Sequence, residues 1–135
     1  MRYHVDWSKQ FVIVTDASGY AVGYALLQVD NNGNSQIVRT GSKTLNETQQ
    51  RYSTTEKEAF GLVYAVEDCK HYVRGQSFLI KTDHRSLTFF DTRAPKNDKC
   101  ARWLNFLNQF DFLVVYLEGS LNCLADYFSR KDEAI

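Results

Sequence analysis

A cluster of turn-forming residues near the start of the chain, Asp30-Asn31-Asn32-Gly33-Asn34, restricts the possible folds more than any other feature. Aspartate, asparagine and glycine accept the backbone conformations that tight hairpins require. The cluster separates two strand-like segments, 20–29 and 35–43, and the sequence Phe-Val-Ile-Val-Thr at 11–15 forms a third. The first forty residues therefore predict an antiparallel meander of three strands.

The hydrophobic pattern then changes from strand-like to helical. Ser53 and Glu56 have the spacing of a capping box, in which two side chains satisfy backbone N–H groups at the start of a helix. Apolar residues recur after it at helical spacing: Leu62, Val63, Val66, Cys69 and Val73. This pattern predicts one helix that begins after Ser53 and ends near Arg74-Gly75, because glycine commonly terminates helices.

Strands and helices alternate in the rest of the chain. Segments 77–82 and 112–117 have strand character, and a helix with an aromatic face follows Pro95. Two shorter helices are expected, one at 86–91 and one at 123–130. This order predicts an α/β fold, with a mixed five-stranded sheet flanked by helices.

Composition and charge narrow the class of protein. Hydrophobic residues make up 44% of the 135 residues, which is sufficient for the core of one domain. The 16 basic residues balance 16 acidic ones, and this excludes a strongly basic nucleic-acid binder. No apolar run approaches the roughly 18 residues of a membrane span, so no membrane partner is expected. Three widely spaced cysteines indicate a reduced, intracellular protein.

Four carboxylates stand at positions that an exposed surface does not readily explain. Asp16 and Asp83 end the first and fourth predicted strands, where a cap or an Asx turn is the ordinary alternative. Glu58 lies on the apolar stripe of its helix, where a carboxylate is costly without a cation or a donor. Asp126 falls in the first turn of the last predicted helix, which the helix dipole alone would explain.

Taken together, the four carboxylates indicate a metal site. Two strand ends and the first turns of two helices can meet at one edge of a sheet. Like charges gathered there require divalent cations, and oxygen-only ligands favour Mg²⁺ or Mn²⁺. Two such ions about 4 Å apart are a standard device for phosphodiester hydrolysis.

Several motifs occur in an order that is typical of one family. They are Thr15-Asp16-Ala17-Ser18, Tyr52-Ser53-Thr54-Thr55-Glu56-Lys57-Glu58, Thr82-Asp83-His84 with Ser86-Leu87, Arg102-Trp103, and Asn122 with Ala125-Asp126 and Ser129-Arg130. As an ordered set they closely resemble the ribonuclease H domain of reverse transcriptase in gypsy-type (Metaviridae-like) LTR retrotransposons. The resemblance covers roughly residues 11–130.

The resemblance implies a ribonuclease H-like fold and a single domain over residues 1–135, with its core at about 11–130, excised from a larger polyprotein. It also implies endonucleolytic cleavage of the RNA strand of RNA/DNA hybrids during reverse transcription. Two Mg²⁺ ions would serve as cofactors, and Mn²⁺ would substitute for them. The catalytic, metal-binding carboxylates of the family map onto Asp16, Glu58, Asp83 and Asp126.

The start of the central helix carries further candidates. Glu56 competes with Glu58 for the metal-binding role, but it fits the capping box and lies off the apolar stripe, so Glu58 is preferred. Ser53, Thr54 and Thr55 are suited to a phosphate of the DNA strand, because backbone N–H groups are free at a helix start. Plain helix capping is an equal alternative for these three residues.

Other candidate substrate contacts lie in loops. Ala17 and Ser18 leave room for a close approach of the sugar-phosphate backbone beside Asp16. Arg85 is a candidate contact to the RNA strand. Lys96 and Lys99 are candidates for a weak basic face, although a solvated surface is the commoner arrangement.

Zero net charge predicts weak, salt-sensitive binding of the hybrid by the isolated domain. The polymerase domain of the same polyprotein is therefore the expected protein partner. The expected location is intracellular, in the cytoplasm or a virus-like particle, with the nucleus as an alternative.

Two other functions remain open. One is a non-catalytic ribonuclease H-like module with a structural or connecting role, against which the presence of all four carboxylates argues. The other is a host-adopted module that retains the acids but binds nucleic acid or protein.

One departure from the family concerns packing: Tyr24 stands where the family has a small residue, so the second strand is expected to pack differently.

Overall fold

A computed structural model describes residues 4–82 and 98–116. The helices expected at 86–91 and 123–130 lie outside these residues. The described strands are β1 (Val12–Ala17), β2 (Ala21–Val29), β3 (Ser35–Thr44), β4 (Ser77–Thr82) and β5 (Asp111–Tyr116). The described helices are α1 (Glu47–Gln50), α2 (Thr54–Asp68), α3 (Lys70–Val73) and α4 (Asp98–Leu107).

The five strands form one mixed sheet in the order β3-β2-β1-β4-β5. The hairpin pairs β1/β2 and β2/β3 are antiparallel, whereas β1/β4 and β4/β5 are parallel. Parallel neighbours need a crossover connection, and α2 and α3 provide it between β3 and β4. The predicted meander and the predicted mixed sheet are therefore confirmed.

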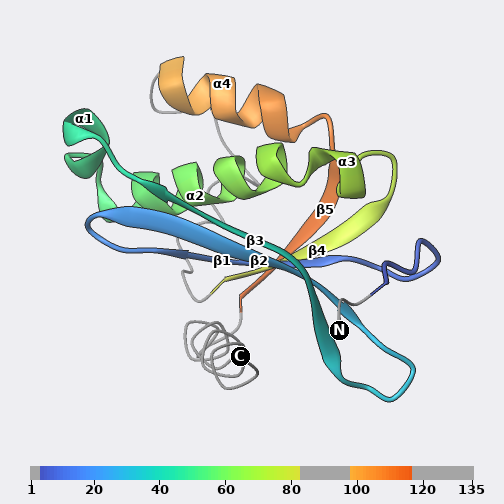
Figure 1. Ribbon diagram of the computed structural model, residues 1–135. Helices are drawn as coiled ribbons and strands as arrows, with labels where there is room; N and C mark the ends of the chain where they lie inside the picture. Colours follow the sequence, from blue (N-terminus) through green and yellow to red (C-terminus); the bar gives the residue numbers. More distant parts are fainter. Residues whose placement is uncertain (1–3, 83–97, 117–135) are drawn as a thin grey trace.

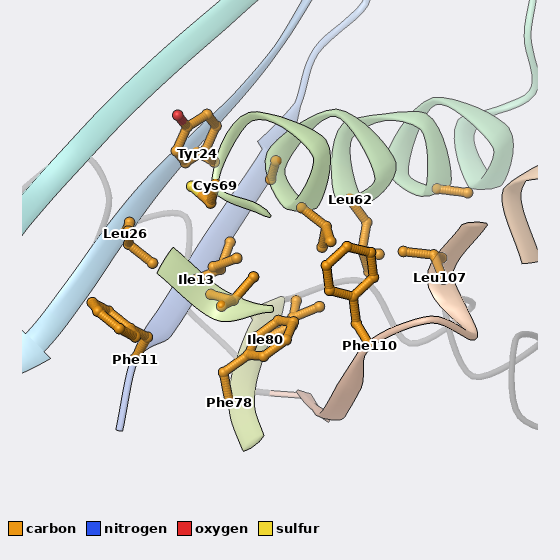
Figure 2. Close-up of a cluster of buried hydrophobic side chains, with 14 residues drawn as sticks. Phe11, Ile13, Tyr24, Leu26, Leu62, Cys69, Phe78, Ile80, Leu107 and Phe110 are labelled. Atoms are coloured by element: carbon orange, nitrogen blue, oxygen red, sulfur yellow. The ribbon is translucent and has the colours of Figure 1, made fainter. Parts of the chain in front are cut away.

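The four described helices lie on one side of the sheet (Figure 1). Helix α2 packs directly against β1 and β2, and α4 packs against α2. The main core fills the space between α2 and the sheet, and Figure 2 shows its large side chains. Ile13 and Leu26 reach it from the sheet, Phe11 reaches it from the residue just before β1, and Leu62 reaches it from α2. A smaller cluster, built on Val14, Ala25 and Leu27, occupies the opposite face of the sheet.

The predicted central helix is interrupted at one residue. Cys69 has φ −102° and ψ 6°, so α2 ends at Asp68 and the single turn α3 follows. The Cys69 carbonyl accepts hydrogen bonds from the N–H groups of both Tyr72 and Val73, which tightens the chain at this point. Val73 stays buried in the core, and Gly75, at φ 81°, follows the end of α3. The prediction of one continuous helix was therefore wrong at Cys69, where no glycine or proline marks the break.

Tyr24 is accommodated without leaving β2. Its ring is fully buried and lies over Gly41 of the neighbouring strand, where a Cβ would come within 2.5 Å of the ring atom Cε1. Its hydroxyl donates a hydrogen bond to Asp68 and accepts one from Arg39 Nε at 3.1 Å. The second strand thus packs a large side chain because β3 supplies a residue without a side chain opposite it.

Candidate active site

Asp16 lies one residue before the end of β1. Its neighbour across the β1/β2 ladder is Gly23, and its side chain shares a face of the sheet with Val12 and Val14, as predicted. The residue is half-buried. A carboxylate is therefore held on a rigid strand next to a residue with no side chain, which leaves space around it.

Glu58 projects from the buried stripe of α2. Its side chain shares that stripe with Leu62, Ala65 and Val66, and the residue is only 6% exposed. This position confirms the inward orientation that the helical period predicts. Burial of a carboxylate is costly unless a donor or a cation meets it, so the position marks Glu58 as a functional candidate.

Gly61 brings α2 close to the strand that carries Asp16. A Cβ at Gly61 would lie 3.3 Å from Cβ of Val22 and 3.8 Å from the backbone oxygen of Asp16. Glu58 precedes Gly61 by three residues and therefore lies on the same side of the helix, about one turn earlier. The structure thus brings this part of α2 to the backbone at the end of β1, whereas the Asp16 side chain lies on the Val12/Val14 face of the sheet, opposite the face that α2 covers.

The neighbouring acid, Glu56, is engaged elsewhere. Its Oε1 accepts the Ser53 backbone N–H at 3.1 Å, and the Ser53 hydroxyl accepts the Glu56 N–H at the same distance. This reciprocal pair confirms the predicted capping box. The second oxygen of Glu56, Oε2, lies 2.7 Å from Nζ of Lys99 in α4. Lys99, a candidate for a weak basic face, therefore has its ammonium group paired with a carboxylate.

The candidate substrate contacts differ in their exposure. At the start of α2, Ser53 and Thr54 are exposed and Thr55 is half-buried. After β1, Ala17 is half-buried and Ser18 is exposed.

Ser18 also has a structural task in the turn between β1 and β2. Its hydroxyl accepts the backbone N–H groups of Tyr20 at 3.2 Å and Ala21 at 3.1 Å. Tyr20, four residues after Asp16 in the same turn, is 75% exposed.

Three predicted site residues, Asp83, Arg85 and Asp126, lie outside the described residues. The sheet nevertheless relates the strand that precedes Asp83 to the strand that carries Asp16. Strands β1 and β4 are parallel, with Val14 opposite Lys81. Asp16 and Asp83 each follow that pair by two residues in the sequence.

The donor chemistry of the described carboxylates suits a hard cation. Asp16 and Glu58 offer only oxygen ligands, which Mg²⁺ and Mn²⁺ prefer. Within residues 4–82 and 98–116, no three His, Cys, Asp or Glu side chains gather closely enough to hold a metal. Asp16 and Glu58 are two of the four carboxylates that the sequence predicts as metal ligands, and the other two, Asp83 and Asp126, lie outside that part of the chain. No helix in the described ranges is long and apolar enough to cross a membrane.

Comparison with known proteins places the chain in a family. Residues 6–110 match the RNase H-like domain found in reverse transcriptase. The chain is 36% identical over 125 residues to the retrovirus-related Pol polyprotein from transposon 297 of Drosophila melanogaster. It is 35% identical over 131 residues to the transposon Tf2-3 polyprotein of Schizosaccharomyces pombe. These alignments cover 93% and 94% of the chain but 11% and 10% of the relatives, so the chain spans about a tenth of their length.

Solved structures of low sequence identity share the fold. The foamy viral protease-reverse transcriptase in complex with dsDNA gives a TM-score of 0.71 at 15% identity, covering 87% of this chain and 25% of that one. RNase H1 from Halobacterium salinarum gives 0.60 at 17% identity, covering 84% and 89%. The mixed sheet is therefore an RNase H fold. With the match over residues 6–110 and the retrotransposon relatives, this fold establishes that the chain belongs to the family of RNase H-like domains found in reverse transcriptase.

Proposed function

We propose that this chain hydrolyses the RNA strand of RNA/DNA hybrids, as the ribonuclease H domain of a retrotransposon polyprotein. The observation that carries the proposal is the buried Glu58 carboxylate on the face of α2 that Gly61 brings against the end of β1. Burying a carboxylate is costly unless a donor or a cation meets it, and a divalent cation bound beside the strand that carries Asp16 would meet it. Family membership supports the same activity.

The proposed metal ligands are Asp16, Glu58, Asp83 and Asp126. Divalent cations held there, Mg²⁺ or Mn²⁺, would supply an activated water and stabilise the leaving oxygen. Strand β1 fixes Asp16, and the buried stripe of α2 fixes Glu58, so neither carboxylate needs to reorganise before the reaction. The matching offset of Asp16 and Asp83 from the Val14/Lys81 pair supports their joint role.

The proposed substrate contacts surround these carboxylates. Ser53 caps α2, and Thr54 and Thr55 begin it, where the positive end of the helix dipole favours an anion such as a phosphate of the DNA strand. The small Ala17 and Ser18 follow Asp16 and permit close approach of a sugar-phosphate backbone. One structural neighbour, LC11-RNase H1, is described in complex with an RNA/DNA hybrid; it shares the fold at a TM-score of 0.61 and 15% identity.

Arg85 is proposed to contact the RNA strand. The polymerase domain of the same polyprotein is proposed to supply much of the binding, because a chain of net charge zero attracts nucleic acid weakly. An intracellular location, in the cytoplasm or a virus-like particle, is proposed with it.

The test is cleavage of an end-labelled RNA/DNA hybrid by the purified chain at low salt. We expect cleavage of the RNA strand with Mg²⁺ or Mn²⁺, none with EDTA, and none by Asp16→Asn. Double-stranded DNA of the same sequence is the control substrate. If the chain binds the hybrid without cleaving it, and adding the polymerase domain restores cleavage, the chain is an enzyme that depends on that domain. Neither binding nor cleavage would overturn the proposal and favour a structural module.

A further inference from the structure

An ion pair links the first turn of α2 to the first turn of α4. Lys99, the second residue of α4, places Nζ 2.7 Å from Oε2 of Glu56, and both side chains are 24% exposed. The partners stand 43 positions apart in the sequence, so the pair joins two elements rather than neighbours along one helix. Partial burial shields the pair from solvent and salt, unlike the exposed ion pairs that contribute little.

Aromatic rings enclose the same ammonium group. Lys99 Nζ lies 3.8 Å from the ring centroid of Tyr52 and 5.5 Å from that of Trp103, within the range of cation–π attraction. Tyr52, Phe60 and Trp103 also contact one another, with centroids 5.9 to 6.2 Å apart. The lysine is therefore held by a carboxylate on one side and by aromatic faces on others.

The ion pair acts at the end of α2 that matters for the proposed site. Glu56 uses Oε1 to cap α2 and Oε2 to bind Lys99, so one carboxylate joins the helix start to α4. Glu58 follows two residues later and faces the sheet. Gly61 sets how closely α2 approaches β1 from the sheet side, and Lys99 braces the outer side of the same helix.

We propose that Lys99, through its ion pair with Glu56, positions the first turn of α2 and thereby holds Glu58 in place for metal binding. The inference rests on the proposed function and extends it to a residue that does not touch the substrate. Lys99 is a positioning residue, so its loss should lower the turnover rate and the metal affinity while leaving hybrid binding unchanged.

The test compares four single variants of the full chain and the double variant that combines Lys99→Met with Glu56→Gln. Lys99→Met removes the charge and keeps the length, Lys99→Arg retains the charge, and Glu56→Gln keeps a capping group without the charge. Lys70→Met is the matched control, because it breaks the exposed Lys70–Glu67 pair at the other end of α2. The measurements are kcat and KM on the RNA/DNA hybrid, Mn²⁺ affinity by titration calorimetry, and the melting temperature.

Because small misplacements of a catalytic group are costly, we expect Lys99→Met to lower kcat about tenfold, with KM changed less than about twofold. Mn²⁺ should bind several-fold more weakly, and Lys99→Arg should restore both values. The double variant Lys99→Met/Glu56→Gln should have nearly the same kcat and Mn²⁺ affinity as Lys99→Met alone, because both substitutions remove the same ion pair. Lys70→Met should behave as the wild type.

Three results would overturn the inference. One is that Lys99→Met has the same kcat and the same Mn²⁺ affinity as the control Lys70→Met. Another is a rise in KM alone, which would make Lys99 a substrate contact. The third is that the effects of Lys99→Met and Glu56→Gln on kcat and Mn²⁺ affinity are fully additive in the double variant. Failure of the proposed function looks different, because the wild type itself would then not cleave. Mn²⁺ affinity would still decide the role of Lys99, and a wild type that neither cleaves nor binds Mn²⁺ would overturn both.

Discussion

Glu56 and Glu58 stand two positions apart in α2, and their environments differ in kind. Two residues correspond to about 200° around a helix, so the side chains point to opposite sides. Glu56 caps the helix and binds Lys99, whereas Glu58 is buried toward the sheet. At the scale of single residues, hydrogen bonding thus assigns the capping task to Glu56, and burial places Glu58 where the proposed metal site needs a carboxylate.

Cys69 and Tyr24 make a residue-scale prediction about alkaline stability. Burial raises the pKa of the Cys69 thiol from 9.0 to about 12, and burial together with the hydrogen bond to Asp68 raises the pKa of Tyr24 above its ordinary value of 10.0. Raised pKa values stabilise the fold below the unfolded pKa, and this contribution is lost as the pH rises toward the folded pKa. The free energy of unfolding should therefore fall from about pH 9 upward.

Urea denaturation between pH 7 and 11 checks this prediction. In Cys69→Ala, the pH at which the free energy of unfolding begins to fall should move from about 9 to about 10, because only the raised pKa of Tyr24 then contributes. Val73→Ala is the control, since it leaves a cavity in the same cluster without removing an ionisable group. It should lower stability equally at every pH. An unchanged onset in Cys69→Ala would contradict the assignment.

At the scale of elements, close approach decides how the strands and α2 fit together. Gly41 lets β3 pass under the Tyr24 ring, and Gly61 lets α2 approach β1 and β2. Each contact joins segments that are distant in the sequence. A hydrophobic pattern predicts that these elements exist, but not how closely they approach.

Gly41→Ala should destabilise the chain, because its Cβ would come within 2.5 Å of Tyr24 Cε1. We expect a loss of about 1–3 kcal/mol, typical of overpacking. The same change in a Tyr24→Val background should cost much less, since the ring is gone while Arg39 and Asp68 can still pair. Urea denaturation of the two single variants and the double variant measures this coupling. Equal costs of Gly41→Ala in both backgrounds would contradict it.

The sequence predicts local features of this site well and long-range ones poorly. The Ser53–Glu56 capping box and the inward Glu58 follow from spacing within one helix, and both are confirmed. Helix α1 was not predicted, because the Asn46–Gln49 capping box has no apolar period after it. The sequence predicts only a surface position for Lys99, because its partner Glu56 lies 43 positions away.

At the scale of the whole molecule, residues before the first strand are part of the packed fold. The Gln28 side chain is fully buried and binds the backbone of this segment from both sides of its amide. It accepts the Asp6 N–H at 3.0 Å and donates to the carbonyls of Asp6 at 2.8 Å and Lys9 at 3.2 Å. Trp7 stacks on Tyr72, with centroids 5.9 Å apart and planes at 9°. Packing therefore begins before residue 11, the approximate start of the core predicted from the sequence.

Removal of residues 1–8 should destabilise the chain by about 1–3 kcal/mol, because the buried Gln28 amide loses its two hydrogen bonds to the backbone of Asp6. Gln28→Leu should lower the stability of the full chain, yet partly restore that of the shortened one. Thermal and urea denaturation of the full and the shortened chain, each with and without Gln28→Leu, checks whether the effect of this substitution on stability changes sign. A shortened chain as stable as the full one would show that the segment is dispensable.

The most direct test of the proposed site compares the two glutamates of α2 in one assay. Glu58→Gln and Glu56→Gln are isosteric changes, and each protein is given the same labelled RNA/DNA hybrid with Mg²⁺. We predict that Glu58→Gln lowers RNA cleavage at least about 100-fold while the melting temperature stays close to that of the wild type, whereas Glu56→Gln loses no more than about tenfold. Cleavage that survives Glu58→Gln but is abolished by Glu56→Gln would contradict the assignment of Glu58 to the metal site.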